Sequence, residues 1–501
     1  MSTSIKKNFA YNIVNVVTQM LFPLVTFPYA SRILLADGVG LVDFNNSIIQ
    51  YIILLSSLGI PLYAIRETAR VRNDAKQLSK VSLEIGILHT GLTILGYFAV
   101  FILCFSVDKI AENVTLFLLL STSIFFNAIG CNWLFQGVED FKYITIRSLI
   151  VKLISIAGLY ILVKTREDLL WYAMLMVLST VGGNVFNLFR MRLYMNPSLH
   201  HIKELRPLKH LKPCLRIFAL NLIISIYCNL DIVMLGFLTD STQVGYYVAA
   251  NKIEKILKSV VTALGTVMLP RFSNLIAEGK TEEFGRLSQK SVDFIIALSL
   301  PMLAGIILMA RPTINLFCGD SYAPATLSLQ LLAPLILVIG LSNVMGIQIL
   351  YPQGKEHLVM ISTGVGAFVN FCLNWFLIPT YGCDGAAIST LIAEIGVTLT
   401  MAIIGAKFFP FTICTKQNAL VVMSSSIMLA LCILATSYID GDFNKMLIIP
   451  IIGAVIYGGC MLFFKTPIAM ETYGIVKNKL LKRNKSIQLI IVGSMLYCAT
   501  S

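Results

Sequence analysis

The chain has 501 residues, of which 57% are hydrophobic and only 13% are charged, and its formal net charge is +13 at pH 7. A water-soluble fold of this length needs more charged side chains to cover its surface, so the composition excludes an ordinary soluble protein. A basic surplus is also typical of nucleic-acid binding, but here the basic residues lie in loops between apolar segments, which favours a topology signal. The sequence therefore predicts a protein that acts in or across a membrane, with no nucleic acid as a partner.

Apolar segments of helix length recur along the chain from residue 10 onward. A helix of about 20 apolar residues crosses a bilayer core, whereas barrel strands would alternate over about 10 residues. Helices also pair every backbone amide within the lipid. We therefore predict an all-α polytopic membrane protein with about 14 transmembrane helices. The predicted spans are 10–30, 41–62, 81–106, 114–136, 145–163, 169–189, 214–238, 246–268, 292–310, 326–350, 358–379, 385–405, 418–437 and 445–464.

Most of the 39 Lys and Arg residues fall in one alternate set of loops. These basic loops are Arg66–Lys80, Arg190–Arg216, Arg271–Lys290 and Lys465–Lys485. Because basic loops remain on the cytoplasmic side, this asymmetry places both termini in the cytoplasm. The opposite loops are very short, so we expect no soluble domain on either side. The apolar tail Gln488–Ser501 is too short to cross a membrane and receives no predicted role.

The first twelve predicted spans fall into two halves that share a pattern. Val39-Gly40 precedes Asn46, and Val244-Gly245 precedes Asn251 at the same spacing. Duplicated halves are common in transporters, where the substrate path lies between the repeats. We predict two pseudo-symmetric six-helix bundles around a central cavity plus two extra C-terminal helices. The expected boundaries are 1–189 for the N-terminal bundle, 190–213 for a basic cytoplasmic linker, 214–405 for the C-terminal bundle, and 406–501 for the two additional helices and a basic cytoplasmic tail.

Motifs for catalysis or for a cofactor are scarce. The five histidines show no HExxH spacing, and no GxxxxGK[ST] phosphate loop is present, so we predict neither a metal nor a nucleotide cofactor. Asp440-Gly441-Asp442 has the DxD form that glycosyltransferases use, but its place in a very short external loop favours a polar turn. The cysteines lack CxxC spacing, and only Cys318 and Cys383 fall in predicted external loops. The sequence favours a transporter over an enzyme.

Charged residues inside the predicted spans are the main candidates for function, because a charge at mid-bilayer costs about 3 kcal/mol or more unless it faces protein or water. Asp231 in the seventh span and Lys252 and Lys255 in the eighth are expected at a common depth, about 9–14 Å from the outer end. The two lysines share a helix face. Two interpretations remain open, namely structural ion pairs and a cation-bearing cavity for an anionic substrate group. Lys152 lies nearer the cytoplasmic end of its span, where we expect its side chain to snorkel.

Polar residues also follow the first span at helical spacing. Asn12, Asn15 and Gln19 are three or four residues apart, so they share one face. Such side chains either bond neighbouring helices or face a sugar in a wet cavity, and the spacing fits both. Pro23 and Pro28 indicate a bent helix.

Short motifs spread over residues 5–405 match a known family. They are Tyr11-Asn12, Pro23-Leu24-Val25-Thr26-Phe27-Pro28-Tyr29-Ala30-Ser31-Arg32, Leu58-Gly59-Ile60, Tyr63-Ala64-Ile65-Arg66-Glu67, Gln136-Gly137-Val138-Glu139-Asp140, Gly245-Tyr246-Tyr247, Lys252-Ile253 and Val267-Met268-Leu269-Pro270-Arg271-Phe272-Ser273. With these motifs the chain resembles the bacterial O-antigen flippases. They form part of the polysaccharide-transport branch of the multidrug/oligosaccharidyl-lipid/polysaccharide exporter superfamily.

This resemblance implies a flippase that moves undecaprenyl-diphosphate-linked O-antigen repeat units across the bacterial inner membrane for lipopolysaccharide biosynthesis. Its partners would be the lipid-linked oligosaccharide and membrane lipids, with an O-antigen polymerase and a chain-length regulator acting beside it. The alternatives are a multidrug exporter or another lipid-linked-glycan exporter of the same fold, and an O-antigen polymerase. A multidrug exporter should have an acidic cavity, and a polymerase should carry a large external loop.

Together with the charges inside the spans, the resemblance predicts roles for particular residues. Lys252 and Lys255 would hold the diphosphate, and Asp231 would tune them or compete with them. Arg32 and Arg66 flank the first two spans on opposite sides and would guide the head group, while Asn12 would line the cavity. Family members often have a basic residue directly after the aspartate of the seventh span. Ile232 stands there in this chain, which leaves the local partner of that aspartate open.

Overall fold

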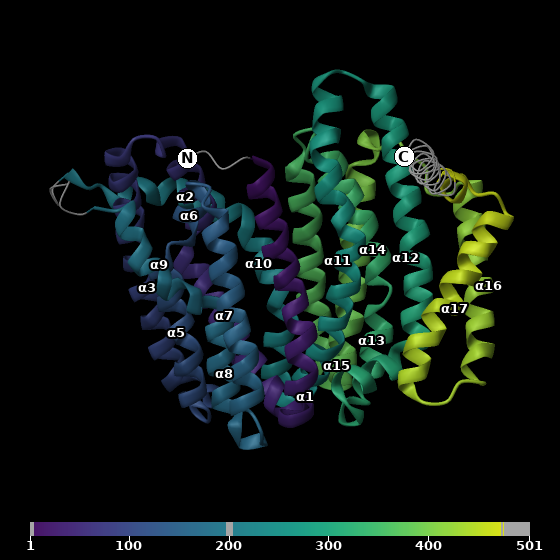
Figure 1. The fold of residues 1–501 in the computed structure, drawn as a ribbon, viewed down its shortest axis with the longest axis horizontal. Coiled ribbons are helices and arrows are strands. Elements are labelled where there is room, and N and C mark those ends of the chain that lie inside the picture. Colours follow the sequence, from purple (N-terminus) through teal and green to yellow (C-terminus); the bar gives the residue numbers. More distant parts are fainter. Residues whose placement is uncertain (1–4, 197–203, 472–473, 475–501) are drawn as a thin grey trace, which may run out of the picture. The chain divides into compact units, whose positions relative to one another are not determined.

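The computed structural model describes residues 5–196, 204–471 and 474. Within these residues the chain forms helices and connecting turns without any strand (Figure 1). Eleven helices of the described part are long and apolar enough to cross a membrane, so the predicted all-helical polytopic class is confirmed. The predicted tail Gln488–Ser501 and part of the linker, 197–203, lie outside the described residues.

The helices follow the predicted spans closely in sequence. Their bounds are α1 (Ile5–Ser57), α2 (Ile60–Val71), α3 (Ala75–Ser106), α4 (Asp108–Ala111), α5 (Val114–Gly130), α6 (Asn132–Gly137), α7 (Phe141–Leu162), α8 (Leu169–Val177), the π-helical turn η2 (Leu178–Gly182), α9 (Gly183–Arg190), α10 (Leu211–Leu238), α11 (Ser241–Ala277), α12 (Thr281–Cys318), α13 (Ala325–Leu332), α14 (Leu335–Asn343), a second π-helical segment η8 (Val344–Leu350), α15 (Glu356–Ile404), α16 (Lys416–Thr436) and α17 (Asp442–Phe463).

Two helices are too long for a single crossing. α1 has 53 residues and α15 has 49, and at 1.5 Å per residue each would reach more than about 70 Å if it were straight. Each is broken by a residue with positive φ, at Leu35 (φ 56°, ψ −173°) and at Gly382 (φ 54°, ψ −130°). Both breaks fall between two predicted spans. The chain therefore reverses at these points by a tight turn rather than through a loop.

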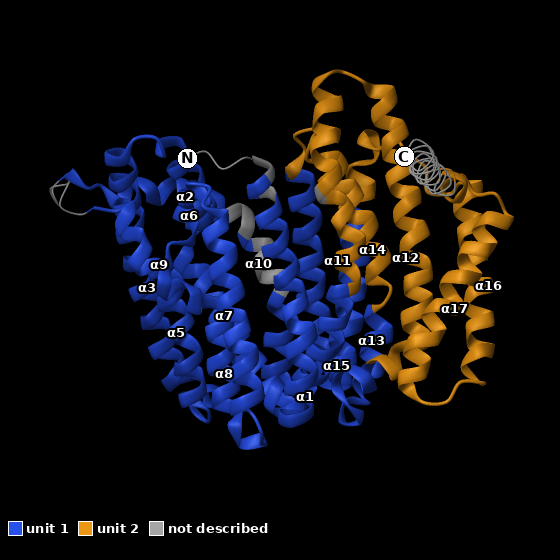
Figure 2. Cartoon of the chain, in the orientation of Figure 1, with its two compact units in different colours: residues 1–256, 314–332, 357–400 blue, residues 257–313, 333–356, 401–501 orange. Residues whose placement is uncertain are grey.

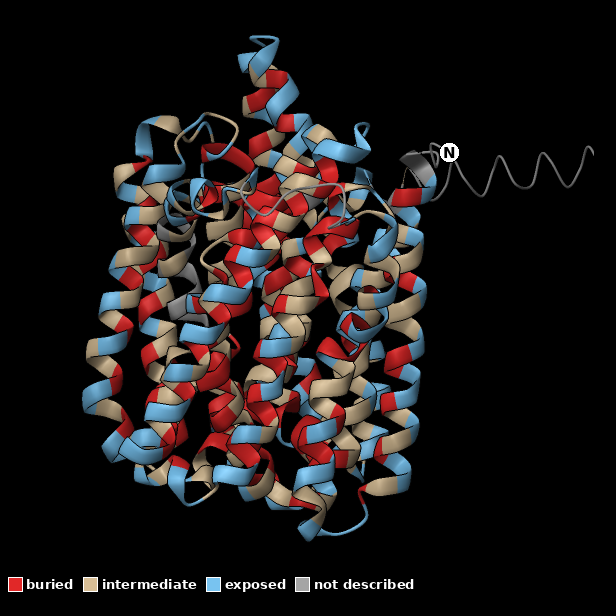
Figure 3. Ribbon diagram, turned by 90° about the vertical axis from the view of Figure 1, so that its left-hand side faces the viewer, coloured by how far each residue is buried: buried red, intermediate tan, exposed pale blue. Residues whose placement is uncertain are grey.

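The outer faces of the helices are strongly apolar. On α3, five large side chains are between 62% and 77% exposed, namely Leu95, Ile94, Phe98, Phe101 and Phe105. Figure 3 shows that exposed and buried positions alternate along the helices. A contiguous apolar surface of this kind suits lipid and not water.

Contacts divide the chain into two compact units (Figure 2). Unit 1 consists of residues 1–256, 314–332 and 357–400, and unit 2 consists of residues 257–313, 333–356 and 401–501. Units defined by packing take pieces from both halves of the sequence. The boundaries predicted from the sequence duplication, at 189, 213 and 405, therefore stay predictions.

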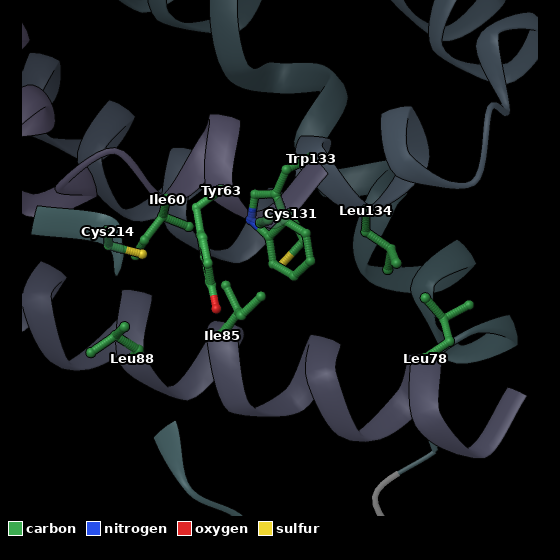
Figure 4. Close-up of a cluster of buried hydrophobic side chains, with 10 residues drawn as sticks. Ile60, Tyr63, Leu78, Ile85, Leu88, Cys131, Trp133, Leu134 and Cys214 are labelled. Carbon is green, nitrogen blue, oxygen red and sulfur yellow. The ribbon is translucent and has the colours of Figure 1, made fainter. Parts of the chain in front are cut away.

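One end of unit 1 has a core formed where α2, α3, α6 and α10 meet. Ile60 of α2, Ile85 of α3, Leu134 of α6 and Cys214 of α10 are fully buried there (Figure 4). Gly59 begins α2 with a φ of +74°, and a Cβ at this position would lie 2.9 Å from the carbonyl oxygen of Cys214. The chain can turn this closely because glycine has no side chain.

A buried hydrogen-bond chain ties the predicted linker to this core. Glu84 of α3 is fully buried, accepts a bond from the Arg206 amide at 2.9 Å and pairs with Lys209. Burial lowers the pKa of His210 below its usual value, so its ring is neutral at pH 7. A neutral ring donates from one nitrogen and accepts at the other. This fits Nε2 donating to Glu84 (3.1 Å) and Nδ1 accepting from the Tyr63 hydroxyl (2.7 Å).

At the opposite end of unit 1, two glycines bring α1 and α11 into backbone contact. A Cβ at Gly40 would lie 1.8 Å from the carbonyl oxygen of Ser241, and one at Gly245 would lie 2.0 Å from that of Ala36. Only a hydrogen atom fits at either position. These are the glycines of the duplicated Val-Gly motif, so the two copies of the motif pack against each other.

Two basic side chains bind backbone carbonyls at the same end of unit 1. Arg32 of α1 donates to the Leu316 carbonyl near the C-terminus of α12 at 2.6 Å. Lys109 of α4 donates to the carbonyls of Gly236 and Thr239 at the C-terminus of α10, at 2.8 and 2.6 Å. Cations at helix C-termini are favourable because the last carbonyls lack helical partners. These contacts fasten α1, α4, α10 and the end of α12 together.

Candidate functional site

An ion pair joins α11 to the second half of α1. The Nζ of Lys252 lies 3.1 Å from Oδ2 of Asp43, and the two side chains are 27% and 13% exposed. The same Nζ lies 4.1 Å from the centroid of the Phe27 ring, which is a cation–π contact. The glycine contact explains this position. Asp43 follows Gly40 by three residues and Lys252 follows Gly245 by seven, and both spacings return to the same helix face.

A pocket of about 230 Å³ opens beside this ion pair, entirely within unit 1. It is formed by α1, α7, α8, η2 and α11, and it combines apolar and aromatic side chains with hydroxyl groups and the ion pair. Its lining consists of Phe22, Pro23, Thr26, Phe27, Asp43, Ser155, Leu159, Tyr172, Leu175, Met176, Ser179, Thr180 and Lys252.

The π-helical turn η2 shapes one wall of this pocket. A π-helical turn is wider than an α-helical turn and often marks a functional site. Here Ser179 and Thr180, which are adjacent in sequence, both line the pocket together with Met176.

Asp231 of α10 forms a second buried polar site. Its Oδ2 accepts from the Tyr247 hydroxyl at 2.7 Å and from the Thr390 hydroxyl at 2.8 Å. Its Oδ1 accepts from the side-chain amides of Asn370 at 2.9 Å and Asn374 at 2.8 Å. All four partners are neutral donors from α11 and α15. In the described part of the chain, no basic side chain is among the hydrogen-bond partners of this carboxylate.

The Asp231 carboxylate has one buried acceptor oxygen beside it in addition to its four donors. Oxygen atoms are the ligands that hard cations prefer, and Oδ1 of Asn374 is buried beside the carboxylate without a hydrogen-bond partner among the described residues. The described residues contain no group of three or more His, Cys, Asp or Glu that could hold a metal ion. The oxygens at this site are therefore one carboxylate and several neutral groups.

The structure does not bring Asp231 and Lys252 together, contrary to the expected local cluster. Tyr247, which binds Asp231, lies five residues before Lys252 on α11, so the two side chains point about 140° apart around the helix. One face of α11 meets α10 and α15, and the other meets α1. A shared depth therefore did not imply a shared site.

The other predicted site residues are dispersed. Lys255 and Asn12 are exposed, and neither is among the residues that line the pocket beside Lys252. Arg32 binds a helix terminus, as described above. Arg66 pairs with Glu67 at 3.3 Å and lies 5.7 Å from the centroid of the Tyr63 ring, near the linker contact. Cys318 and Cys383 are both buried, free thiols, so the structure contains no disulfide between them.

Two features of the site escaped the sequence analysis. Asp43 was overlooked, although it is a carboxylate inside the predicted span 41–62, and that is the signal that could have found it. Lys152 was expected to snorkel but is only 8% exposed. It lies 11 residues after Phe141, the first residue of α7, which at 1.5 Å per residue is about 16 Å from that end. A side chain at this depth does not reach the helix end.

Neutralising the charges of the Lys252–Asp43 pair is expected to separate an effect on folding from an effect on transport. Lys252→Met or Asp43→Asn alone leaves a partly shielded charge without its partner, so each should lower stability by about 1–3 kcal/mol. The double variant should recover most of that stability. If Lys252 serves only the fold, the double variant will also transport normally. We expect instead that the single variants and the double variant all fail to transport. Transport and the thermal midpoint are measured on the same preparations, and the exposed control Lys416→Met should change neither.

Comparison with known proteins agrees with this architecture. The family model described as polysaccharide biosynthesis protein matches residues 5–276, and the MatE model matches residues 217–376. A relative from Escherichia coli K12 named "Putative O-antigen transporter" is 25% identical over 411 residues, which covers 79% of this chain and 96% of that protein.

Two solved structures share the fold. A lipid II flippase MurJ in an inward closed conformation aligns with a TM-score of 0.71 and 18% identity, covering 92% of this chain and all of that one. An inward-facing multidrug resistance MATE family transporter of the MOP superfamily aligns with a TM-score of 0.63 and 15% identity, covering 79% of this chain and 97% of that one. Since the polysaccharide biosynthesis model spans more than half of the chain, the chain belongs to the polysaccharide biosynthesis protein family.

Proposed function

We propose that this protein is a transporter, not an enzyme, and that it flips a lipid-linked oligosaccharide across a membrane. The observation that carries the proposal is the pocket beside Lys252 and Asp43, which lies among helices with apolar outer faces. Such a substrate has a polar glycan, an anionic diphosphate and an apolar tail. A polar pocket gives sugar groups of the head group hydrogen-bond partners inside the membrane, which lowers the cost of their passage, and the tail can remain in lipid.

The proposed substrate is an undecaprenyl-diphosphate-linked O-antigen repeat unit, moved across the bacterial inner membrane during lipopolysaccharide biosynthesis. The E. coli relative named as an O-antigen transporter supports this choice over the peptidoglycan precursor, because the match covers nearly all of that protein. An O-antigen polymerase and a chain-length regulator would use the flipped units on the outer face.

The proposed topology has fourteen spans in two six-helix bundles, with two further C-terminal helices. Dividing α1 at Leu35 and α15 at Gly382 gives two segments of spanning length in each, and α10 is 28 residues long. These four segments, α10 and the other nine candidate spans add up to the proposed fourteen. The basic loops support a cytoplasmic location for both termini.

Unit 2, taken by itself, contains an apolar pocket that can accept hydrocarbon. It has a volume of about 420 Å³ and is lined by α12, α16, α17 and Leu257 of α11. Its walls include Met309, Met428, Cys432 and Ile449, which form a buried apolar cluster. Hydrocarbon can enter such a surface without leaving polar groups unpaired.

We infer that Asp231 couples transport to a proton or to a monovalent cation. The sequence contains no GxxxxGK[ST] phosphate loop, so we propose an ion gradient as the energy source. Because these donors are neutral, a cation that binds the carboxylate breaks no ion pair, but it must displace some of their hydrogen bonds. Its separation from the Lys252 pocket would let ion and substrate bind at distinct places.

A multidrug exporter is the second candidate, and the fold shared with a MATE transporter favours it. Export of cationic drugs requires excess negative charge where the drug binds. The pocket of unit 1 instead carries Lys252 beside Asp43, with Lys152 close by, so cations exceed carboxylates. The charge of the pocket therefore favours an anionic substrate.

Deleting the gene is expected to abolish surface O-antigen and to raise the level of lipid-linked repeat units on the cytoplasmic face. The units can be extracted and quantified, and their side can be found with a membrane-impermeant periodate probe on spheroplasts and on inverted vesicles. A plasmid copy should restore display. Normal display in a strain without a second flippase would refute the proposed function.

A further inference from the structure

Four of the five hydroxyl groups that line the unit 1 pocket, all except that of Tyr172, are arranged to accept hydrogen bonds from a ligand. Thr26 donates to the Phe22 carbonyl (3.0 Å), and Ser155 donates to that of Val151 (2.9 Å). Ser179 and Thr180 donate to the Met176 carbonyl at 2.8 and 2.9 Å. A carbonyl only accepts, so each hydroxyl proton is directed at its own helix. The lone pairs remain for a ligand that supplies O–H or N–H donors.

Lys152 supplies a positive charge at the border of this pocket. Lys152, Ser155 and Leu159 are spaced i, i+3 and i+7, which places them on one face of α7, and Ser155 and Leu159 both line the pocket. The Nζ of Lys152 lies 5.8 Å from the centroid of the Phe22 ring, another lining residue. Among the described residues this buried Nζ has no hydrogen-bond partner.

An unpartnered cation inside a membrane helix destabilises the fold, so its presence indicates a function. Lys252 already has Asp43 as its counter-ion, whereas Lys152 has none within the described residues. The pocket and its border therefore hold one more positive charge than negative charge. A bound group with a single negative charge would balance it.

The size and the aromatic walls of the pocket indicate one sugar ring. A volume of about 230 Å³ corresponds to about eight water molecules, which is on the order of a single monosaccharide and too small for an oligosaccharide. Phe22 and Phe27 offer apolar faces on which the C–H face of a sugar can pack. Sugar hydroxyls supply the donors that the four pocket hydroxyls lack.

We propose that this pocket is a subsite for one acidic monosaccharide of the transported glycan, with Lys152 binding its carboxylate. This proposal rests on the proposed function, since it names a chemical feature of the same substrate. A diphosphate fits less well, because it offers only acceptors and would face the lone pairs of Thr26, Ser155, Ser179 and Thr180. The acidic sugar supplies both the donors and the single negative charge.

Binding of simple glycosides to the purified full-length protein tests the subsite. The protein is placed in nanodiscs of phosphatidylcholine, and saturation-transfer NMR measures binding of methyl glycosides in matched pairs. The first two pairs are glucuronide with glucoside and galacturonide with galactoside. The third is the methyl glycoside of N-acetylneuraminic acid with the methyl ester of that glycoside. At least one acidic member should bind about tenfold more tightly than its neutral partner.

Variants then assign the charge. Lys152→Met should weaken the acidic glycoside about tenfold and leave the neutral one unchanged, whereas Ser155→Ala and Thr180→Val should weaken both. Lys142→Met, on an exposed residue of the same helix, is the matched control. Because Lys152→Met removes an unpaired buried charge, it should also raise the thermal midpoint. A purely structural role for Lys152 requires the midpoint to fall.

Three outcomes would overturn the subsite: equal binding of every acidic and neutral pair, acidic binding that Lys152→Met leaves intact, or a lower midpoint in that variant. Inorganic pyrophosphate provides a further arm. If it binds in a Lys152-dependent manner while no acidic glycoside does, the site takes a diphosphate and the acidic-sugar proposal is wrong. The gene-deletion phenotype does not depend on any of these results, so flipping itself would stand.

Discussion

Replacing either Gly40 or Gly245 by alanine is expected to reduce transport about tenfold or more, although each change adds a single methyl group. The new Cβ would lie 1.8 Å from the Ser241 carbonyl oxygen or 2.0 Å from the Ala36 carbonyl oxygen. These are backbone atoms, which cannot rotate aside as a side chain can. The helices α1 and α11 would have to separate by about 1.5–2 Å to reach ordinary contact distance.

Such a separation would open the end of unit 1 that is predicted to face outside. A cysteine introduced at Thr26, in the pocket, should then react faster with an impermeant maleimide added outside, read out by peptide mass spectrometry. Gly91→Ala and Gly396→Ala are matched controls, because a Cβ at these helical positions meets nothing within 4 Å. They should transport normally and gain up to about 1 kcal/mol of stability from helix propensity. Wild-type transport by Gly40→Ala would show that the close contact is dispensable.

Asp231→Asn is expected to abolish the dependence of transport on an ion gradient. Four groups donate to this carboxylate at 2.7–2.9 Å, and an amide in its place presents donor protons to at least one of them. The loss of one acceptor in a buried site should destabilise the protein by about 1–3 kcal/mol. The loss of the charge should reduce gradient-driven transport about tenfold or more, because the proposed cation or proton then has no counter-charge.

Proteoliposomes with an imposed proton or sodium gradient can separate these two effects. We expect the Asp231→Asn protein to bind lipid-linked glycan but to lose the stimulation that the gradient gives. Asp384→Asn is a suitable control, since Asp384 lies on α15 and accepts a hydrogen bond from Ser328 at 2.6 Å. Gradient stimulation that survives in the Asp231 variant would rule out this carboxylate as the coupling site.

The sequence predicted the helical class and most span positions, because each helix must by itself be long and apolar enough to cross the bilayer. It also found the duplicated Val-Gly motif, although only the structure shows the two copies in contact. Lys252 and Asp43 are 209 residues apart in the sequence, and no local pattern pairs them. Their meeting depends on which face of α11 touches α1.

The partners of Asp231 could not be predicted from the sequence for the same reason. Its depth in the membrane followed from the span boundaries, but its partners come from α11 and α15 through helix packing. Asn370 and Asn374 are spaced four residues apart, and Thr390 lies on the other side of the break in α15. Single polar residues in apolar helices are common, so only their convergence on one carboxylate distinguishes these three.

The turns at Leu35 and Gly382 leave almost no chain beyond the helix ends. Thr239 and Asp240, between α10 and α11, form a similarly short connection at the same end of unit 1. A protease, an antibody or a phage tail protein added from that side would meet little extended backbone to bind at these three turns. At these turns a binding protein would meet closed helix ends, and any contact that it makes with the apolar helix faces would depend on bilayer thickness.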